Sequence, residues 1–153
     1  MKDSYSVSSV EETWAVAAQF AKELGPGDVV CLEGDLGAGK TTFVQGLAAA
    51  LGVSGPVASP TFCIVREYKT APGSAVPFLV HMDLYRLSGE EDVESTGWDD
   101  YIAGGAAVAV EWPDRAGSLV PGNAWRVRFE YSADGDDSRT ISFSKPSASA
   151  GMV

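Results

Sequence analysis

The chain has 153 residues, of which 45% are hydrophobic and 21% charged, the composition of an ordinary globular domain. Its 11 Lys and Arg stand against 21 Asp and Glu, a formal net charge of −10, so it lacks the basic surface needed to grip nucleic acid by itself. No stretch approaches roughly 18 apolar residues and the first residues are polar. We therefore expect no membrane span, no signal peptide and a cytoplasmic location.

The first predicted element is a helix that opens at residues 8–12. Ser9 and Glu12 have the spacing of a capping box, in which each side chain accepts a hydrogen bond from the backbone near the other. An apolar stripe at helical spacing predicts the buried face of this helix: Trp14, Ala17, Ala18, Ala21 and Leu24. The dipeptide Gly25-Pro26 then ends the helix.

Residues 34–41 read G-x-x-x-x-G-K-T, the pattern of a phosphate-binding loop (P-loop). An apolar run at 28–33 precedes the pattern and a helical segment at 42–51 follows it, and this strand–loop–helix context is the one in which the motif occurs. Glycines let the backbone approach a triphosphate, Lys40 can reach its β- and γ-phosphates, and the Thr41 hydroxyl can bind Mg²⁺. The sequence therefore predicts a nucleoside triphosphate site with magnesium.

Downstream of this loop the expected elements are short. Apolar runs bounded by turn residues predict three strands, at 62–68, 76–83 and 106–111. An acidic segment at 90–102 predicts one or two short helices. Cys31 and Cys63 fall in predicted strands without zinc-ligand spacing, and we expect buried, reduced thiols.

Residues 125–131 and 139–143 alternate polar and apolar, which predicts an antiparallel hairpin with one solvated face and a turn at Asp134-Gly135. We expect one P-loop ATPase domain over residues 1–144, followed by a disordered tail at 145–153. The predicted fold class is α/β: a P-loop NTPase-like three-layer sandwich whose central sheet is mostly parallel and carries the antiparallel C-terminal hairpin.

Two carboxylates, Asp83 and Glu111, each end an apolar strand and should face the phosphate loop. A triphosphatase needs an acid to hold the metal and a polar group to orient the attacking water, and the pattern alone does not decide which residue does which. Each could instead cap the next segment or pair with Arg86. His81 lies two residues before Asp83, where a lone strand histidine is most simply a hydrogen-bonded structural residue.

Several nucleotide-protein signatures are missing from the chain. There is no N-K-x-D motif to read guanine and no D-x-x-G after either acidic strand. Residues 88–105 contain no arginine, whereas the lid of a small-molecule kinase usually carries several. An ATPase is therefore favoured, while a small-metabolite kinase and a non-hydrolysing nucleotide-binding adaptor remain as alternatives.

Four motifs in order resemble the TsaE (YjeE) family of small bacterial P-loop ATPases. They are residues 33–42 around the phosphate loop, Ser-Pro-Thr-Phe at 59–62, His-Met-Asp-Leu-Tyr-Arg at 81–86, and Glu-Trp-Pro at 111–113. The resemblance implies that ATP and Mg²⁺ are the cofactors and that the chain acts in forming N6-threonylcarbamoyladenosine at position 37 of tRNAs that read codons beginning with A. It also implies docking on a TsaD–TsaB complex, which would hold the tRNA. Because the sequence places no obvious arginine finger, we expect slow hydrolysis by the isolated chain.

The resemblance also assigns roles to residues. The implied phosphate contacts are Gly37, Ala38, Gly39, Lys40, Thr41 and Thr42. Thr41 and Glu111 are implied to hold Mg²⁺, and Lys40, Asp83 and Glu111 to serve hydrolysis. By the resemblance Thr61 senses the γ-phosphate, although a simple turn after Pro60 would also explain it.

Three further residues have weaker support. Thr13 and Arg139 lie where the family has adenine-side contacts, but no motif fixes either position. Trp112 can stack near the nucleotide or a partner, or simply pack beside its strand.

Overall fold

The computed structural model describes residues 1–34, 39–55, 57, 65–131 and 138–145. In this part of the chain one seven-stranded sheet has the order β1-β7-β6-β2-β5-β4-β3. The strands are β1 (Ser4–Val7), β2 (Val29–Gly34), β3 (Val65–Lys69), β4 (Phe78–Asp83), β5 (Ala107–Glu111), β6 (Trp125–Tyr131) and β7 (Arg139–Ser144). The helices are α1 (Val10–Ala21), α2 (Lys40–Ala50), α3 (Glu90–Glu94) and α4 (Trp98–Ala103), with a 3₁₀ segment η1 (Pro113–Leu119).

The centre of the sheet is parallel and both edges are antiparallel. Strands β4, β5, β2 and β6 run parallel as neighbours, while β7 and β1 extend one edge and β3 the other in antiparallel pairing. The predicted C-terminal hairpin of β6 and β7 is confirmed, and β6 also joins the parallel centre through β2. The sequence did not predict β1, nor that β3 and β4 pair as an antiparallel edge.

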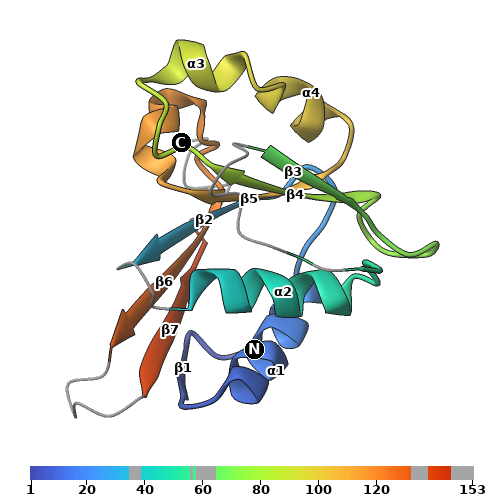
Figure 1. The fold of residues 1–153 in the computed structure, drawn as a ribbon, viewed down its shortest axis with the longest axis vertical. Coiled ribbons are helices and arrows are strands. Elements are labelled where there is room, and N and C mark those ends of the chain that lie inside the picture. The colour runs from blue at the N-terminus through green and yellow to red at the C-terminus, as the bar shows by residue number, and fades with distance from the viewer. Residues whose placement is uncertain (35–38, 56, 58–64, 132–137, 146–153) are drawn as a thin grey trace, which may run out of the picture.

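Helices cover both faces of the sheet, so the predicted three-layer α/β architecture is confirmed (Figure 1). Successive residues of β2 alternate between the layers: Val30 and Leu32 pack in the core with α1 and α2, and Val29 and Cys31 in the core with α3, α4 and η1. Because the central strands are buried on both faces, they are near-continuous apolar runs in the sequence. Cys31 is a buried free thiol, as predicted, and Cys63 lies outside the described residues.

Helix α1 begins at the predicted cap. The Ser9 hydroxyl accepts a hydrogen bond from the Glu12 N–H at 3.0 Å, and the Glu12 carboxylate accepts one from the Ser8 N–H at 3.1 Å. The Ser8 hydrogen bonds hold the pKa of Glu12 below its ordinary value, because they stabilise the ionised form. The cap therefore satisfies backbone groups that the first helical turn leaves without partners.

The predicted buried face of α1 was right at Ala17, Ala21 and Leu24 and wrong at Trp14 and Ala18. Trp14 is 43% exposed and Ala18 only half-buried. The helix also buries three residues that the predicted stripe left out, Thr13, Val16 and Phe20. The ring of Phe20 sets which face of α1 is buried, because it packs edge-to-face on Trp125 at a centroid distance of 5.1 Å and also contacts Phe143.

Other boundaries shifted by a few residues. Strand β4 begins at Phe78, two residues later than expected, because Pro77 lacks an N–H for the ladder. The acidic segment forms both short helices, α3 and α4, which bury Val93 and Trp98. The first residues of the predicted strand 62–68 and the turn at 134–135 lie outside the described residues. None of the described helices is long and apolar enough to cross a membrane.

Candidate functional site

The candidate site forms where three parallel strands end at the same edge of the sheet. Strand β2 ends at Gly34, β4 at Asp83 and β5 at Glu111, and Asp83 stands opposite Glu111 in the β4–β5 register. Gly34 has φ 146°, and an added Cβ would lie 2.4 Å from the Phe129 carbonyl oxygen, so the turn out of β2 requires glycine. The topology thus brings two acids to the start of the phosphate loop.

Helix α2 begins directly after the loop. Gly39 has a left-handed backbone (φ 105°, ψ 12°) and its carbonyl accepts the first helical hydrogen bond, from the Phe43 N–H at 2.9 Å. Among the described residues, no side chain caps the start of α2, and the first turn of this helix carries no acidic residue. Thr41 and Thr42 are half-buried in this turn. The first-turn N–H groups of α2 therefore offer an anion site of the kind found at helix N-termini.

Lys40 lies between the loop and the acidic strand ends. Its Nζ donates to the Gly34 carbonyl oxygen at 3.0 Å and stands 3.8 Å from Oε1 of Glu111. The Lys40 residue is 8% exposed. A lysine held by one carbonyl and one distant carboxylate can exchange both for the oxygens of a phosphate.

Glu111 is held from the other side by His81. The imidazole Nε2 lies 2.8 Å from Oε2 of Glu111 and is the donor, because a carboxylate only accepts. His81 is 0% exposed and Glu111 8% exposed, so this contact is buried. The sequence predicted a hydrogen-bonded structural histidine at position 81, and the side-by-side packing of β4 and β5 shows that its partner is Glu111.

Asp83 is half-buried and caps the turn that follows β4. Its Oδ1 accepts a hydrogen bond from the Tyr85 N–H at 3.0 Å. The Leu84 N–H donates to the Glu111 carbonyl at 3.1 Å, which fixes the two strand ends side by side. Asp83 therefore does cap the segment that follows it, the alternative that the sequence left open, and its carboxylate still lies at the edge of the site.

An exposed aromatic pair flanks the two acids. The rings of Tyr85 and Trp112 lie 4.9 Å apart between centroids, and the residues are 56% and 42% exposed. Trp112 has φ 58° and ψ 54°, a left-handed conformation that costs a bulky residue on the order of 1–3 kcal/mol. The sequence did not predict this conformation; the one available signal was Pro113, two residues after the end of β5, where the chain direction must change.

Arg139 and Thr13, which the resemblance places on the adenine side, differ from each other in their surroundings. The stem of Arg139 reaches the loop, since a Cβ placed on Gly39 would lie 3.8 Å from Arg139 Cδ, and its guanidinium lies 5.0 Å from the Tyr131 ring centroid. Thr13 is buried on α1 and donates its hydroxyl to the Ser9 carbonyl at 3.2 Å. Gly37, Ala38 and Thr61 lie outside the described residues.

The described residues contain no group of three or more His, Cys, Asp or Glu that could hold a metal by itself. Mg²⁺ does not need such a cage, because it commonly binds one or two protein oxygens together with waters and substrate phosphates. Glu111 and the half-buried Thr41 supply oxygen donors of the required kind beside Lys40, so the residues fit a magnesium–nucleotide complex.

Known proteins match nearly the whole chain. The family model "Threonylcarbamoyl adenosine biosynthesis protein TsaE" matches residues 7–141. The tRNA threonylcarbamoyladenosine biosynthesis protein TsaE of Bacillus subtilis (strain 168) is 44% identical over 133 residues, which cover 87% of this chain and 79% of the relative. The protein of the same name from Treponema pallidum (strain Nichols) is 35% identical over 133 residues, covering 87% and 95%.

The fold comparison agrees with the family match. A crystal structure of YdiB from Bacillus subtilis has a TM-score of 0.76 to this chain at 34% sequence identity, covering 97% of this chain and 88% of that one. The family match runs from β1 into β7 and so includes every described residue of the candidate site. The chain therefore belongs to the TsaE family.

Proposed function

We propose that this protein is a magnesium-dependent P-loop ATPase required for forming N6-threonylcarbamoyladenosine at position 37 of tRNAs that read codons beginning with A. The observation that carries the ATPase proposal is the meeting of Lys40 and Glu111, 3.8 Å apart, at the open start of α2. A cation, a metal-binding acid and free helix N–H groups are the parts that triphosphate hydrolysis requires.

In this proposal the triphosphate lies along the loop and the first turn of α2. The N–H groups of residues 39–42 hold phosphate oxygens, and Lys40 exchanges the Gly34 carbonyl for the β- and γ-phosphates. Thr41 and Glu111 hold Mg²⁺, which when bound would neutralise the charge that develops on the phosphates. Asp83 then orients water or supports the hydration shell of the metal.

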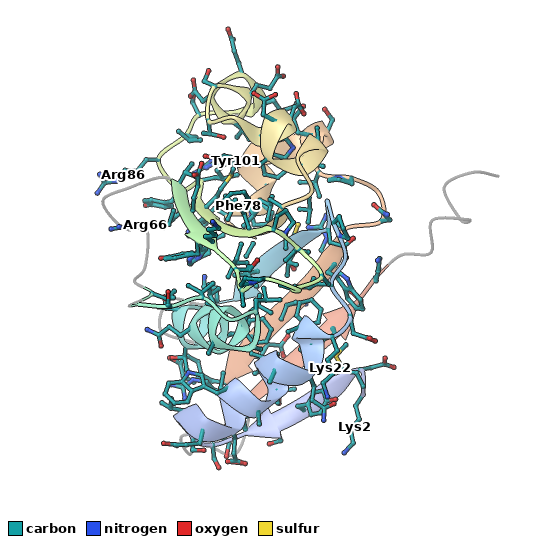
Figure 2. All side chains as sticks on the ribbon, turned by 90° about the vertical axis from the view of Figure 1, so that its right-hand side faces the viewer. Lys2, Lys22, Arg66, Phe78, Arg86 and Tyr101 are labelled. Atoms are coloured by element: carbon teal, nitrogen blue, oxygen red, sulfur yellow. The ribbon has the colours of Figure 1, made fainter. Side chains whose placement is uncertain are left out.

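We also propose that this chain works on a TsaD–TsaB complex that holds the tRNA. The net charge of −10 supports that arrangement, because an acidic chain is poorly suited to bind tRNA through its phosphates. Arg126 and Arg128 pair with Glu33 at 3.0 and 3.5 Å, so their charge is partly neutralised. Arg66 and Arg86 project from the same side of the molecule (Figure 2), where they can contact such a complex.

Reconstitution tests this proposal. TsaD, TsaB, tRNA and the threonylcarbamoyl donor are combined with this chain and ATP, and modified adenosine and released phosphate are counted over many turnovers. We expect sustained modification with the wild type and little with Glu111→Ala. Glu94→Ala, which removes an exposed acid of α3, is the matched control and should behave as wild type.

Two outcomes would contradict the proposal. Full modification with a non-hydrolysable ATP analogue would identify a nucleotide-binding adaptor. A phosphorylated small-molecule product, with no effect on tRNA modification, would identify a kinase.

A further inference from the structure

His81 is the single histidine of the chain and is fully buried on β4. It shares a sheet face with Leu79 and Asp83 and stands opposite Ala109 of β5. Because the Ala109 side chain is one methyl group, the imidazole has room to lean along β5 toward Glu111, two residues further on. The side chains of His81 and Glu111 therefore meet diagonally across β4 and β5, although the strand register does not place these two residues directly opposite each other.

The two oxygens of Glu111 face different partners. Oε2 accepts from His81 Nε2 at 2.8 Å, while Oε1 lies 3.8 Å from Lys40 Nζ, beyond the usual length of a charge-assisted hydrogen bond. Nδ1 of His81 is buried and has no hydrogen-bond partner among the described residues. The contact with Glu111 is thus the polar interaction that fixes the orientation of this ring.

The hydrogen bond between His81 and Glu111 also affects how closely Glu111 approaches Lys40. A glutamate side chain that nothing else holds would close onto a neighbouring lysine, reaching roughly 2.7–2.9 Å in a tight ion pair. Such a pair would occupy both the cation needed for phosphate and the acid needed for metal. The hydrogen bond from His81 holds Glu111 on the opposite side and keeps Oε1 available.

We propose that His81 is a positioning residue that orients Glu111 toward Mg²⁺ and keeps Glu111 from closing onto Lys40. This inference rests on the proposed function, since it concerns the metal-binding acid of that site. A buried histidine that only filled the core would affect stability alone, whereas a positioning histidine controls how strongly magnesium promotes nucleotide binding.

Two substitutions at His81 separate these roles. His81→Leu keeps a buried side chain of similar bulk but removes the donor, while His81→Gln places an amide N–H within similar reach of Glu111. Leu79→Val, at the neighbouring buried position on the same face, is the matched packing control. Calorimetry with a non-hydrolysable ATP analogue, with and without Mg²⁺, measures how much the metal strengthens binding.

For His81→Leu we expect the Mg²⁺-dependent gain in affinity to fall about 10–100-fold, the usual effect of removing a group that orients a metal ligand. The magnesium concentration for half-maximal hydrolysis should rise by a similar factor. His81→Gln should recover a substantial part of both losses, and Leu79→Val should match wild type. A full Mg²⁺ gain in folded His81→Leu, or equal losses in His81→Leu and His81→Gln, would overturn the inference.

A nucleotide-free measurement keeps this inference separable from the proposed function. Because the chain has one histidine, nitrogen-15 spectra of the imidazole are unambiguous. We expect the Nε2–H form, and a clear change in the Nε2 signal in Glu111→Ala. If that signal does not change, the positioning contact is absent and the inference fails. If wild type binds no nucleotide while the signal does respond, the proposed function fails instead.

Discussion

Lys40 and Glu111 meet at a distance that leaves both groups available to a ligand. Their separation of 3.8 Å in a nearly buried setting gives attraction without a tight hydrogen bond, and each has a second partner, the Gly34 carbonyl and His81. Exchanging such contacts for phosphate and Mg²⁺ costs less than breaking a fully formed buried ion pair. Removing one partner of such a pair costs about 3–5 kcal/mol, because the other charge is left buried and unpaired. The resting geometry is therefore suited to nucleotide binding.

Lys40→Ala tests the cation at this site. The variant loses charge-assisted contacts to phosphate worth on the order of 1.5–3 kcal/mol, so ATP affinity should fall about 10–150-fold. Displacement of a fluorescent ATP analogue measures the loss, and thermal melting checks that the variant folds. Lys22→Ala, which removes an exposed lysine just after α1, should bind as wild type. Unchanged affinity in Lys40→Ala would remove Lys40 from the phosphate site.

The pH dependence of stability tests the environment of Cys31. Burial raises the pKa of this thiol to about 11 from 9.0 in the unfolded chain, because the thiolate is poorly solvated. Above pH 9 the unfolded state therefore releases the proton while the folded state keeps it, so stability falls as pH rises toward 11. Between pH 8 and pH 10 the wild type should lose about 1 kcal/mol more than Cys31→Ala.

Urea unfolding of both proteins at the two pH values measures this difference. Other titrating groups, including Cys63, are common to both chains and cancel in the comparison. An equal loss in the two proteins would show that the Cys31 thiol ionises as easily folded as unfolded.

At the scale of elements, the α1–α2 contact depends on a glycine within a helix. Gly46 is buried in α2, and a Cβ added there would lie 2.9 Å from Cα and Cδ1 of Trp14 and 3.0 Å from Cβ of Ala17. Glycine costs a helix interior about 1 kcal/mol relative to alanine, so the close approach of α1 must outweigh that cost. The two helices lie side by side against one face of the sheet (Figure 1).

Gly46→Ala should destabilise the protein by about 1–3 kcal/mol despite its better helix propensity, because the added methyl group forces α1 away from α2. Chemical denaturation measures the change. Gly122→Ala is the control, since a Cβ there meets nothing within 4 Å, and it should change stability by about 0.5 kcal/mol or less. A stabilised Gly46→Ala protein would show that the helices can separate freely.

The sequence predicted a helix or strand correctly where a single residue pattern ran through the whole segment. Strand β6 was predicted with its observed bounds because Val127 and Phe129 alternate with charged residues, a pattern that belongs to strands alone. The face of α1 was predicted only in part, with Trp14 and Ala18 wrongly included, because its many alanines allow several helical stripes and only tertiary contacts of Phe20 choose among them. Strand β1 was missed because its four residues become a strand by pairing with β7, far along the chain.

At the scale of the whole molecule, the site is assembled from segments that the sequence could identify but not arrange. The phosphate loop and the two acids were predicted from local pattern and from resemblance to a family. Their convergence follows from the parallel order β2-β5-β4, which aligns the strand ends. The partnership of His81 with Glu111 could not be predicted, because it depends on the register between two strands separated by α3 and α4.

The most direct test of the account is calorimetric titration of folded protein with ATP, in Mg²⁺ and in chelator, alone and with the TsaD–TsaB complex. The account predicts saturable binding of one nucleotide per chain, tighter with Mg²⁺, with the magnesium effect abolished in Glu111→Ala. Absence of ATP binding under all of these conditions, or a magnesium effect that Glu111→Ala leaves intact, would contradict a nucleotide held between the phosphate loop and the acid at the end of β5.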